Sequence, residues 1–287
     1  MRLILLVAAC TTVTTVALAQ TPAGWDSVAR VLQTPAAPAA GYLRYNFPRR
    51  DLQVRIGDVT LLPGLALGAW AGFAGEPSTA TMMGDLVLTA AELPPVLAEL
   101  AAQDIAVTAV HNHLVGEEPQ VTYVHFHARG AATALAARLD RVLARTATPR
   151  PVVPAPPGPV TIDTAMIFNA LGQRGRAQGA LAQVGFVLVP GAVTMDGAVL
   201  VPALAYASPV NIQMVDGARA VATGDFAVLG SRVGPVLRAL TSHGITATAV
   251  HHHLIDSTPA IFFIHFWADG ASLSVLDGLR AALDAAR

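Results

Sequence analysis

Residues 83–131 have the sequence MGDLVLTAAELPPVLAELAAQDIAVTAVHNHLVGEEPQVTYVHFHARGA, and residues 223–271 have the sequence TGDFAVLGSRVGPVLRALTSHGITATAVHHHLIDSTPAIFFIHFWADGA. The two stretches align without a gap at an offset of 140 residues, and residues 84–131 and 224–271 share 19 identities over 48 positions. This similarity indicates an internal duplication, which has to be recognised before a fold class is assigned. With only two copies, a closed pseudo-dimer is favoured over an extended solenoid.

The duplication predicts the domain organisation of the chain. The predicted segments are a signal peptide at 1–19, a first repeat at 20–147, a linker at 148–160 and a second repeat at 161–287. The linker, TPRPVVPAPPGPV, is rich in proline, which favours an extended conformation and a stiff connection. Upstream, the stretch 41–70 shares a weaker rhythm with the stretch 179–208.

The hydrophobic periodicity predicts mixed strands and helices in each repeat. In the first repeat, strands are expected at 43–47, 52–56, 67–73, 82–88, 105–113 and 121–128, and helices at 92–103 and 131–144. Short helices are also expected at 26–32 and 163–171, capped by Asp26 and Asp163. The predicted fold class is α+β, with two homologous α/β sandwich halves of mostly antiparallel sheets related by a pseudo-two-fold axis.

The composition is that of a globular protein without a basic surface for nucleic acid. Of the 287 residues, 53% are hydrophobic and 13% are charged, which supplies a sizeable core. The formal net charge of −1 leaves no field to attract nucleic acid. The expected partner is a small-molecule ligand or substrate, and the pattern contains no transmembrane span for the mature chain.

The N-terminus has the pattern of a secretory signal peptide. Arg2 provides a positive charge, the stretch from Leu3 to Ala19 is apolar, and small residues precede Gln20. The protein is therefore expected to be periplasmic or secreted. The only cysteine is Cys10, in a segment that resembles a lipobox, so a lipoprotein is the less favoured alternative. The mature chain is expected to contain no disulfide.

All nine histidines lie in the two repeats. Because residues two apart on a strand point to the same face, each His-x-His pair presents two imidazoles together. If the two histidine-bearing strands of the first repeat are neighbours, one sheet face presents up to four imidazoles. The predicted metal ligands are His111, His113, His125 and His127 in the first repeat, and His251, His253 and His265 in the second.

A single histidine on an apolar strand is more often a hydrogen-bonded core residue than a ligand. Several uncoordinated imidazoles packed together, however, lose hydration without compensation. The clusters therefore predict a divalent metal, with zinc as the first candidate, because three histidines and an open water position are typical of catalytic zinc sites. An envelope protein with merely buried histidines is the structural alternative.

The acidic residues make the two repeats unequal. Glu117 and Glu118 lie between the two histidine strands of the first repeat, where either is a candidate fourth ligand or catalytic general base. The second repeat has Ser and Thr at these positions, and Trp267 replaces His127. The sequence therefore favours the first repeat as the active copy and the second as an altered site.

Two weaker features have structural and functional interpretations. An Arg-Arg-Asp cluster at 49–51 has no counterpart in the second repeat, and it is either a solvated turn or a site where one arginine holds an anionic group. A Gly-Asp pair recurs at 84–85 and 224–225, and is interpreted as a turn or bulge whose aspartate accepts backbone hydrogen bonds.

The motif T-A-x-H-N-H, followed by E-x-P and H-x-H, together with FPRRDLQV upstream, resembles the LppY/LpqO family, also known as DUF1259. The resemblance covers most of the mature chain as two copies. It implies the duplicated architecture, and an exported or lipid-anchored protein, but no reaction. The second copy departs from the motif at His252 and Trp267. The spacing also loosely resembles that of acetolactate decarboxylase, which implies a metal that polarises a carbonyl.

The predicted function is thus an exported metal-binding protein. A metal-dependent hydrolase or lyase that uses the first histidine cluster is one class. A non-catalytic periplasmic module that binds a metal or a small ligand is the alternative.

Overall fold

The computed structural model describes residues 24–154, 156 and 158–287. The predicted signal peptide at 1–19, with Cys10, lies outside these residues. The main elements of the first half are α1 (Asp26–Leu32), β1 (Ala36–Ala39), β2 (Tyr42–Pro48), β5 (Gly68–Ala74), β6 (Ala80–Thr89), α3 (Leu93–Ala102), β7 (Ala106–His111), β9 (Val121–Gly130) and α4 (Ala132–Leu143). Those of the second half are α5 (Thr164–Leu171), β10 (Arg176–Gln178), β11 (Leu181–Phe186), β14 (Ser208–Met214), β15 (Arg219–Leu229), α7 (Gly230–Ser242), β16 (Thr246–His251), β17 (Ile261–Ala271) and α8 (Ser272–Ala286).

The two halves share one topology. The first sheet has the strand order β1-β2-β5-β6-β9-β7, and the second has the order β10-β11-β14-β15-β17-β16. Every strand pair within these two sheets is antiparallel. The predicted duplicated α+β fold is therefore confirmed.

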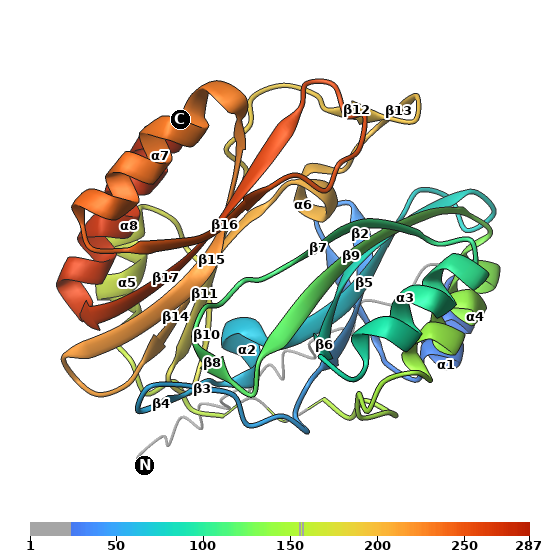
Figure 1. Cartoon of the computed structure of the whole chain (residues 1–287), viewed down its shortest axis with the longest axis horizontal. Coiled ribbons are helices and arrows are strands. Elements are labelled where there is room, and N and C mark those ends of the chain that lie inside the picture. Colours follow the sequence, from blue (N-terminus) through green and yellow to red (C-terminus); the bar gives the residue numbers. More distant parts are fainter. Residues whose placement is uncertain (1–23, 155, 157) are drawn as a thin grey trace, which may run out of the picture.

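The main helices cover the outer face of each sheet. In Figure 1, α1, α3 and α4 lie against the first sheet, whereas α5, α7 and α8 lie against the second. Each half has its own hydrophobic core between its sheet and its helices, because the strands direct alternate apolar side chains to that side. The other faces of the two sheets turn toward each other, so polar residues on those faces meet between the halves.

Short elements join the halves across this space. They are β3 (Arg55–Ile56), β4 (Val59–Thr60), α2 (Pro63–Ala66), β8 (Glu117–Glu118), β12 (Thr194–Met195), β13 (Ala198–Val199) and α6 (Pro202–Ala205). The predicted strand at 52–56 is wrong in part, since only β3 forms and it pairs with β4 and β8 rather than with the main sheet. Of the two predicted helix caps, Asp163 is confirmed by its bond from the Met166 N–H, whereas the helix after Trp25 has no side-chain cap.

Side-chain amides fix the position of the second half on the first. The Gln183 amide donates to the Gly64 carbonyl at 2.9 Å, and the Asn211 amide donates to the Leu65 carbonyl at 2.9 Å. Gln213 accepts from the Leu62 N–H and donates to the Thr60 carbonyl. A third apolar cluster, which includes residues of both halves, also packs between them. These contacts make the space between the sheets a defined interface rather than a flexible gap.

Gly84 and Gly224 lie inside strands β6 and β15, not in turns or bulges as predicted. A Cβ on Gly84 would lie 2.3 Å from the Trp70 carbonyl oxygen, and a Cβ on Gly224 would lie 2.0 Å from that of Pro209. Glycine is therefore needed because the neighbouring strand approaches too closely for a side chain. The aspartate that follows each glycine then lies in mid-sheet.

The strand registers correct the weak upstream alignment by one residue. Arg44 lies opposite Gly72, and Gln183 lies opposite Asn211 in the second half. On the next strand, Gly72 lies opposite Met83 and Asn211 lies opposite Thr223. Because Met83 and Thr223 are equivalent in the two repeats, Arg44 is equivalent to Gln183. The offset between the repeats at this strand is therefore 139 residues rather than 138. A shift of one residue exchanges the two faces of a strand, so the correction decides which side chains meet between the halves.

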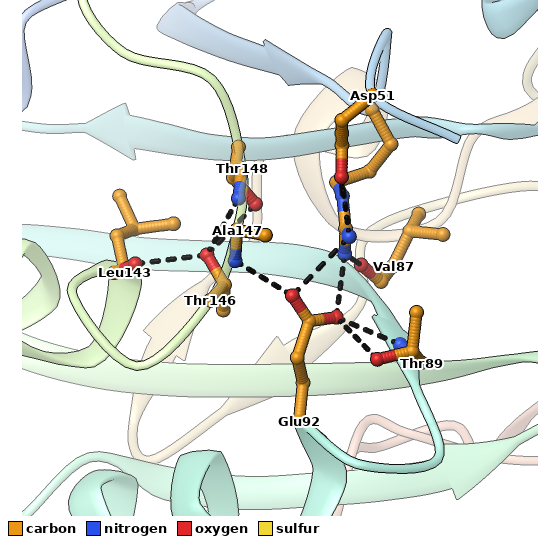
Figure 2. Close-up of polar contacts among 9 residues, drawn as sticks. Asp51, Val87, Thr89, Glu92, Leu143, Thr146, Ala147 and Thr148 are labelled. Carbon is orange, nitrogen blue, oxygen red and sulfur yellow. Dashed lines mark hydrogen bonds and ion pairs between the residues drawn. The ribbon is translucent and has the colours of Figure 1, made fainter.

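The Arg49 side chain is buried at the edge of the first half, which excludes a solvated turn for this residue. Its guanidinium donates to Asp51, to the Val87 carbonyl and to Glu92 (Figure 2). Glu92 also accepts from the N–H groups of Thr89 and Ala147. The network joins the end of β2, the end of β6, the start of α3 and the segment after α4. Because all of its donors are used inside the protein, Arg49 is structural and not a binding residue.

We expect Arg49→Met to destabilise the protein strongly. The variant leaves Glu92 and Asp51 without their cation, and the loss of one partner from a buried ion pair costs about 3 kcal/mol or more. Urea unfolding followed by circular dichroism measures the free energy of unfolding. Arg50→Met is the matched control, since Arg50 makes only an exposed bond to the Val153 carbonyl. Equal stability of the two variants would contradict the assignment.

The same network predicts an acid-dependent loss of stability. Burial raises the pKa of Glu92, but hydrogen bonds from Ala147, Arg49 and Thr89 outweigh it and hold the pKa below the ordinary 4.5. A carboxylate with a lowered pKa stabilises the fold above its unfolded-state pKa, and this stabilisation is lost as the pH falls through the folded-state value. We expect Glu92→Gln to flatten the fall in unfolding free energy below about pH 4.5. A wild-type slope in the variant would disprove this assignment.

Candidate metal centre

The histidine-bearing strands of each half are neighbours, which meets the condition for one sheet face to present several imidazoles. β7 pairs with β9, which places His111 opposite Tyr123 and Ala109 opposite His125. β16 pairs with β17 in the same register, with His251 opposite Phe263. In both strand pairs the face that carries these histidines is turned toward the other half.

The two histidine clusters form one centre at the interface of the halves. The ring centroids of His111 and His251 are 4.0 Å apart, those of His113 and His265 are 3.9 Å apart, and those of His125 and His253 are 3.8 Å apart. Each of these contacts joins a histidine of one repeat to a histidine of the other. The two clusters therefore lie together as one group of histidines rather than as two separate sites, while the choice of the first repeat as the active copy stays a prediction.

The centre follows the pseudo-two-fold symmetry of the fold. His111 and His125 are 4.9 Å apart between ring centroids, and their counterparts His251 and His265 are 5.0 Å apart. The stacked ring on the outer side is also repeated: His113 lies 3.6 Å from Tyr123, and His253 lies 3.8 Å from Phe263. The local axis thus passes between His111 and His251, and both repeats contribute the same residues.

Three ring nitrogens converge in the middle of the centre. His265 Nε2 lies 3.2 Å from His111 Nε2 and 2.9 Å from His251 Nε2. His265 Nδ1 lies 3.2 Å from the Gly224 carbonyl, which only accepts, so Nδ1 carries the proton and Nε2 has a free lone pair. The single lone pair on His265 Nε2 cannot accept a well-aligned hydrogen bond from both His111 and His251. A tetrahedral zinc with Zn–N bonds of about 2.0–2.1 Å separates its ligand nitrogens by roughly 3.3 Å, close to the spacing found here.

Two sets of histidines have ligand atoms close enough to share an ion. Among the residues that the structure describes, they are His111 with His251 and His265, and His111 with His113 and His125. His111 belongs to both sets. The first combines the two repeats, and the second is the triad that the sequence predicts.

Asp85 and Asp225 are the site residues that the sequence analysis missed. Asp85 Oδ2 lies 3.6 Å from His113 Nε2 and 4.0 Å from His125 Nε2, and Asp225 Oδ1 lies 3.9 Å from His265 Nδ1. Both aspartates are buried. The recurrence of Gly-Asp in both repeats was the signal for them, but its meaning depends on where β6 and β15 lie in the sheets.

The protein alone does not satisfy this cluster. Several buried polar atoms have no hydrogen-bond partner among the described residues. They are Asp85 Oδ1, Asp225 Oδ1, His111 Nδ1, His113 Nε2, His125 Nε2, His251 Nδ1 and His253 Nδ1. Unpartnered buried polar atoms are rare in folded proteins, and a bound ion is a recognised explanation for them. The donor set therefore fits a cation.

Burial sets the protonation of these groups. It lowers the pKa of His111 to about 2, with repulsion from His251 adding to the effect, and lowers the pKa of His253 to about 3. Burial also raises the pKa of the Asp85 carboxyl to about 8, although Arg44 opposes the shift. The pKa of Asp225 is raised by burial and by the neighbouring Asp85. Neutral imidazoles are the form that binds metal, and a cation would favour ionised carboxyl groups.

The other predicted site residues lie outside both close sets. His127 is directed toward Asp196, with Nδ1 3.8 Å from its carboxylate. Glu117 is buried in β8, where it accepts a bond from the Val121 N–H at 3.3 Å, and Glu118 is exposed. The catalytic roles of Glu117 and Glu118 stay predictions.

A cavity of about 780 Å³ adjoins the centre. Both halves line it, and its wall includes His113, His125 and His265 together with Asp85 and Asp225. Small-molecule sites usually have volumes of about 300–1,000 Å³. The histidine cluster therefore opens onto a space that admits a small ligand.

Comparison with solved structures finds distant likenesses. The fused permuted hexameric shell protein MSM0275 from the RMM microcompartment is 14% identical, with a TM-score of 0.19, over 73% of this chain and 85% of that one. The double-ringed trimeric shell protein MSM0271 from the same microcompartment is 10% identical, with a TM-score of 0.18, over 75% and 86%. At these TM-scores neither likeness carries an argument. No curated protein matches the chain.

A family model described as "Domain of Unknown Function (DUF1259)" matches residues 26–145 and again residues 165–285. Each match spans one half of the structure, including its sheet, its outer helices and its three converging histidines. The two matches together cover most of the chain, so this protein belongs to the DUF1259 family, as two tandem copies of the domain.

Proposed function

We propose that the protein binds one divalent transition metal between its two halves, through Nε2 of His111, His251 and His265. The observation that carries this proposal is the position of His265 Nε2, which lies 3.2 Å from His111 Nε2 across the interface and 2.9 Å from His251 Nε2. Zinc is the proposed ion, because neutral imidazoles and tetrahedral spacing suit it. The bond from His265 to the Gly224 carbonyl supports this role, since zinc-bound histidines usually donate their other N–H.

Charge supports a divalent ion. Six neutral imidazoles contribute no charge, while Asp85 and Asp225, when ionised, contribute two negative charges to the same buried region. Two adjacent buried carboxylates are unfavourable without a cation. A divalent ion neutralises both carboxylates, which accounts for the burial of two aspartates in the same region.

The adjoining cavity indicates that the metal serves a small molecule rather than only the fold. Structural zinc sites are closed by four protein ligands, whereas catalytic sites keep one position for water or substrate. We therefore propose a small-molecule site at the metal. Metal-dependent hydrolase or lyase chemistry is the second candidate, favoured by the Asp85 carboxyl, which lines the cavity beside His113 and His125 and is placed to exchange a proton with a bound molecule. A turnover screen of the zinc-loaded protein separates an enzyme from a non-catalytic binding module.

We also propose that the protein acts outside the cytoplasm. The support is the signal-like pattern from Arg2 to Ala19. A site made of histidines and carboxylates, in a chain whose single cysteine lies in that pattern, suits an oxidising compartment. In the described part of the chain, no helix has the length and apolarity to cross a membrane.

We expect elemental analysis of the purified protein to give one zinc per chain. His265→Ala should reduce the metal content to background, because it removes the nitrogen shared by both close contacts. His113→Ala should retain most of the metal. His252→Ala is the matched control, since this histidine lies between two site residues on the same strand end but is exposed.

The variants discriminate between the two close sets. Loss of metal in His113→Ala with retention in His265→Ala would replace the composite site by the first-repeat triad. Wild-type metal content in His111→Ala would disprove both, because His111 belongs to each of them.

We expect Asp85→Asn to weaken zinc binding by about 10- to 100-fold without unfolding the protein. The amide keeps the shape of the carboxyl but removes one of the two buried negative charges that the divalent ion would neutralise, and changes outside the ligand shell have effects of this size. Competition with a chromogenic chelator measures the affinity. Asp256→Asn, at an exposed loop position, is the control. An unchanged affinity in Asp85→Asn would remove the aspartate from the centre.

A further inference from the structure

Strand β2 presents a polar face to the cavity. Its burial alternates, so that Leu43, Tyr45 and Phe47 enter the core while the residues between them face the other half. Arg44 and Asn46 therefore line the cavity, next to Trp70 of the adjacent strand. The polar face of β2 is not needed for the core.

Arg44 is held in place but lacks a carboxylate partner. Its guanidinium lies 4.1 Å from the centre of the Trp70 ring, and its Nε donates to Asn46 Oδ1 at 2.8 Å. Its remaining bond, to the Tyr42 hydroxyl, is long at 3.5 Å. Within the described ranges no acidic side chain forms an ion pair with Arg44. By contrast, the buried Arg49, which directly follows β2, forms ion pairs with two carboxylates, those of Asp51 and Glu92.

The charge of Arg44 is therefore poorly compensated. Burial, with repulsion from Arg176, lowers the pKa of its guanidinium, and attraction from Tyr42 and Asp85 offsets this only in part. Stacking on an aromatic ring orients a guanidinium without neutralising it. An arginine fixed by neutral groups, with part of its planar edge facing a cavity, is the arrangement expected where a ligand supplies the anion.

The sheet register connects Arg44 to the histidine centre. Asn46 lies opposite Trp70, Trp70 opposite Asp85, and Asp85 opposite His125. These residues form one row across four strands. Since adjacent strands are about 4.8 Å apart, the guanidinium above Trp70 lies roughly 10 Å from the His125 position. One small molecule therefore spans both features.

The second half does not repeat this arrangement. Gln183 occupies the position equivalent to Arg44, and its amide is used by the Gly64 carbonyl and by Asn211. The cavity thus has one anchored guanidinium on one side of a nearly symmetric centre. This asymmetry gives a bound molecule a single orientation.

We propose that the cavity binds a small carboxylate-containing molecule, with its carboxylate on Arg44 above Trp70 and a second oxygen directed at the histidine centre. This inference rests on the metal-binding function proposed above. A carboxylate is favoured because it is planar and accepts two parallel hydrogen bonds from a guanidinium. A second guanidinium, that of Arg176, also lines the cavity and adds to its attraction for an anion.

The test is calorimetric titration of the zinc-loaded protein with succinate, glutarate and adipate. At least one dicarboxylate should bind, and 1,4-butanediol, an uncharged molecule of similar length, should not. Arg44→Gln should weaken that binding about 10- to 100-fold, as expected for loss of a charged hydrogen-bonded pair. Its zinc content should equal that of the wild type, because Arg44 is not among the close histidine sets.

A second variant keeps the test decisive if Arg44→Gln does not fold. Asn46→Asp places a carboxylate 2.8 Å from Arg44 Nε, so it supplies the missing partner internally and should block dicarboxylate binding. Full binding in Asn46→Asp or in Arg44→Gln overturns the inference.

The metal and the carboxylate are measured separately. If the zinc-loaded wild type binds no dicarboxylate, the inference fails while the proposed metal function stands. If the wild type binds no zinc, the proposed function fails, and titration of the metal-free protein decides the Arg44 subsite. Dicarboxylate binding that depends on Arg44 then supports the subsite, and its absence overturns it.

Discussion

The meeting of six imidazoles and two carboxyl groups between the two sheets is the constraint on which the inner part of this structure depends. Burial removes these groups from water, and several of their polar atoms find no protein partner. Such a cluster is costly unless something compensates it. A cation does so in two ways, by accepting lone pairs from the imidazoles and by neutralising Asp85 and Asp225. The metal proposal rests first on the contacts of His265 Nε2 with His111 and His251, because the unpartnered ring nitrogens are other atoms of the cluster.

The duplication explains how such a centre arises. One half presents three histidines on an open sheet face, where they would remain hydrated. Packing a second copy against that face, related by the pseudo-two-fold axis, doubles the set and excludes water. The amide bonds of Gln183, Asn211 and Gln213 to the first half hold the two faces in register. Stability of the interface and assembly of the centre are therefore coupled.

Symmetry is broken both in the centre and around it, since the His111 and His265 rings are 4.9 Å apart between centroids and their counterparts His251 and His125 are 6.1 Å apart. His127 has Trp267 as its counterpart, and this tryptophan packs against the hydrophobic core of the first half. Arg44 has Gln183 as its counterpart, which serves the interface. One half thus keeps polar side chains that face the cavity, while the other half uses the same positions for packing. The two copies of the domain therefore form one cavity whose two sides carry different side chains.

The sequence by itself determined the duplication, the α+β class, the strands that carry the histidines and most element positions. These follow from local periodicity and from identities that need no knowledge of contacts, and the histidines at 111, 113 and 125 were found because alternation on a strand is a local rule. Only the tertiary structure decided that His251 and His265 complete the centre around His111, because contacts 140 residues apart depend on how two sheet faces pack. The same holds for Asp85, whose role is set by its place in mid-sheet, and for Arg44, whose facing depends on a register that differs by one residue from the sequence alignment.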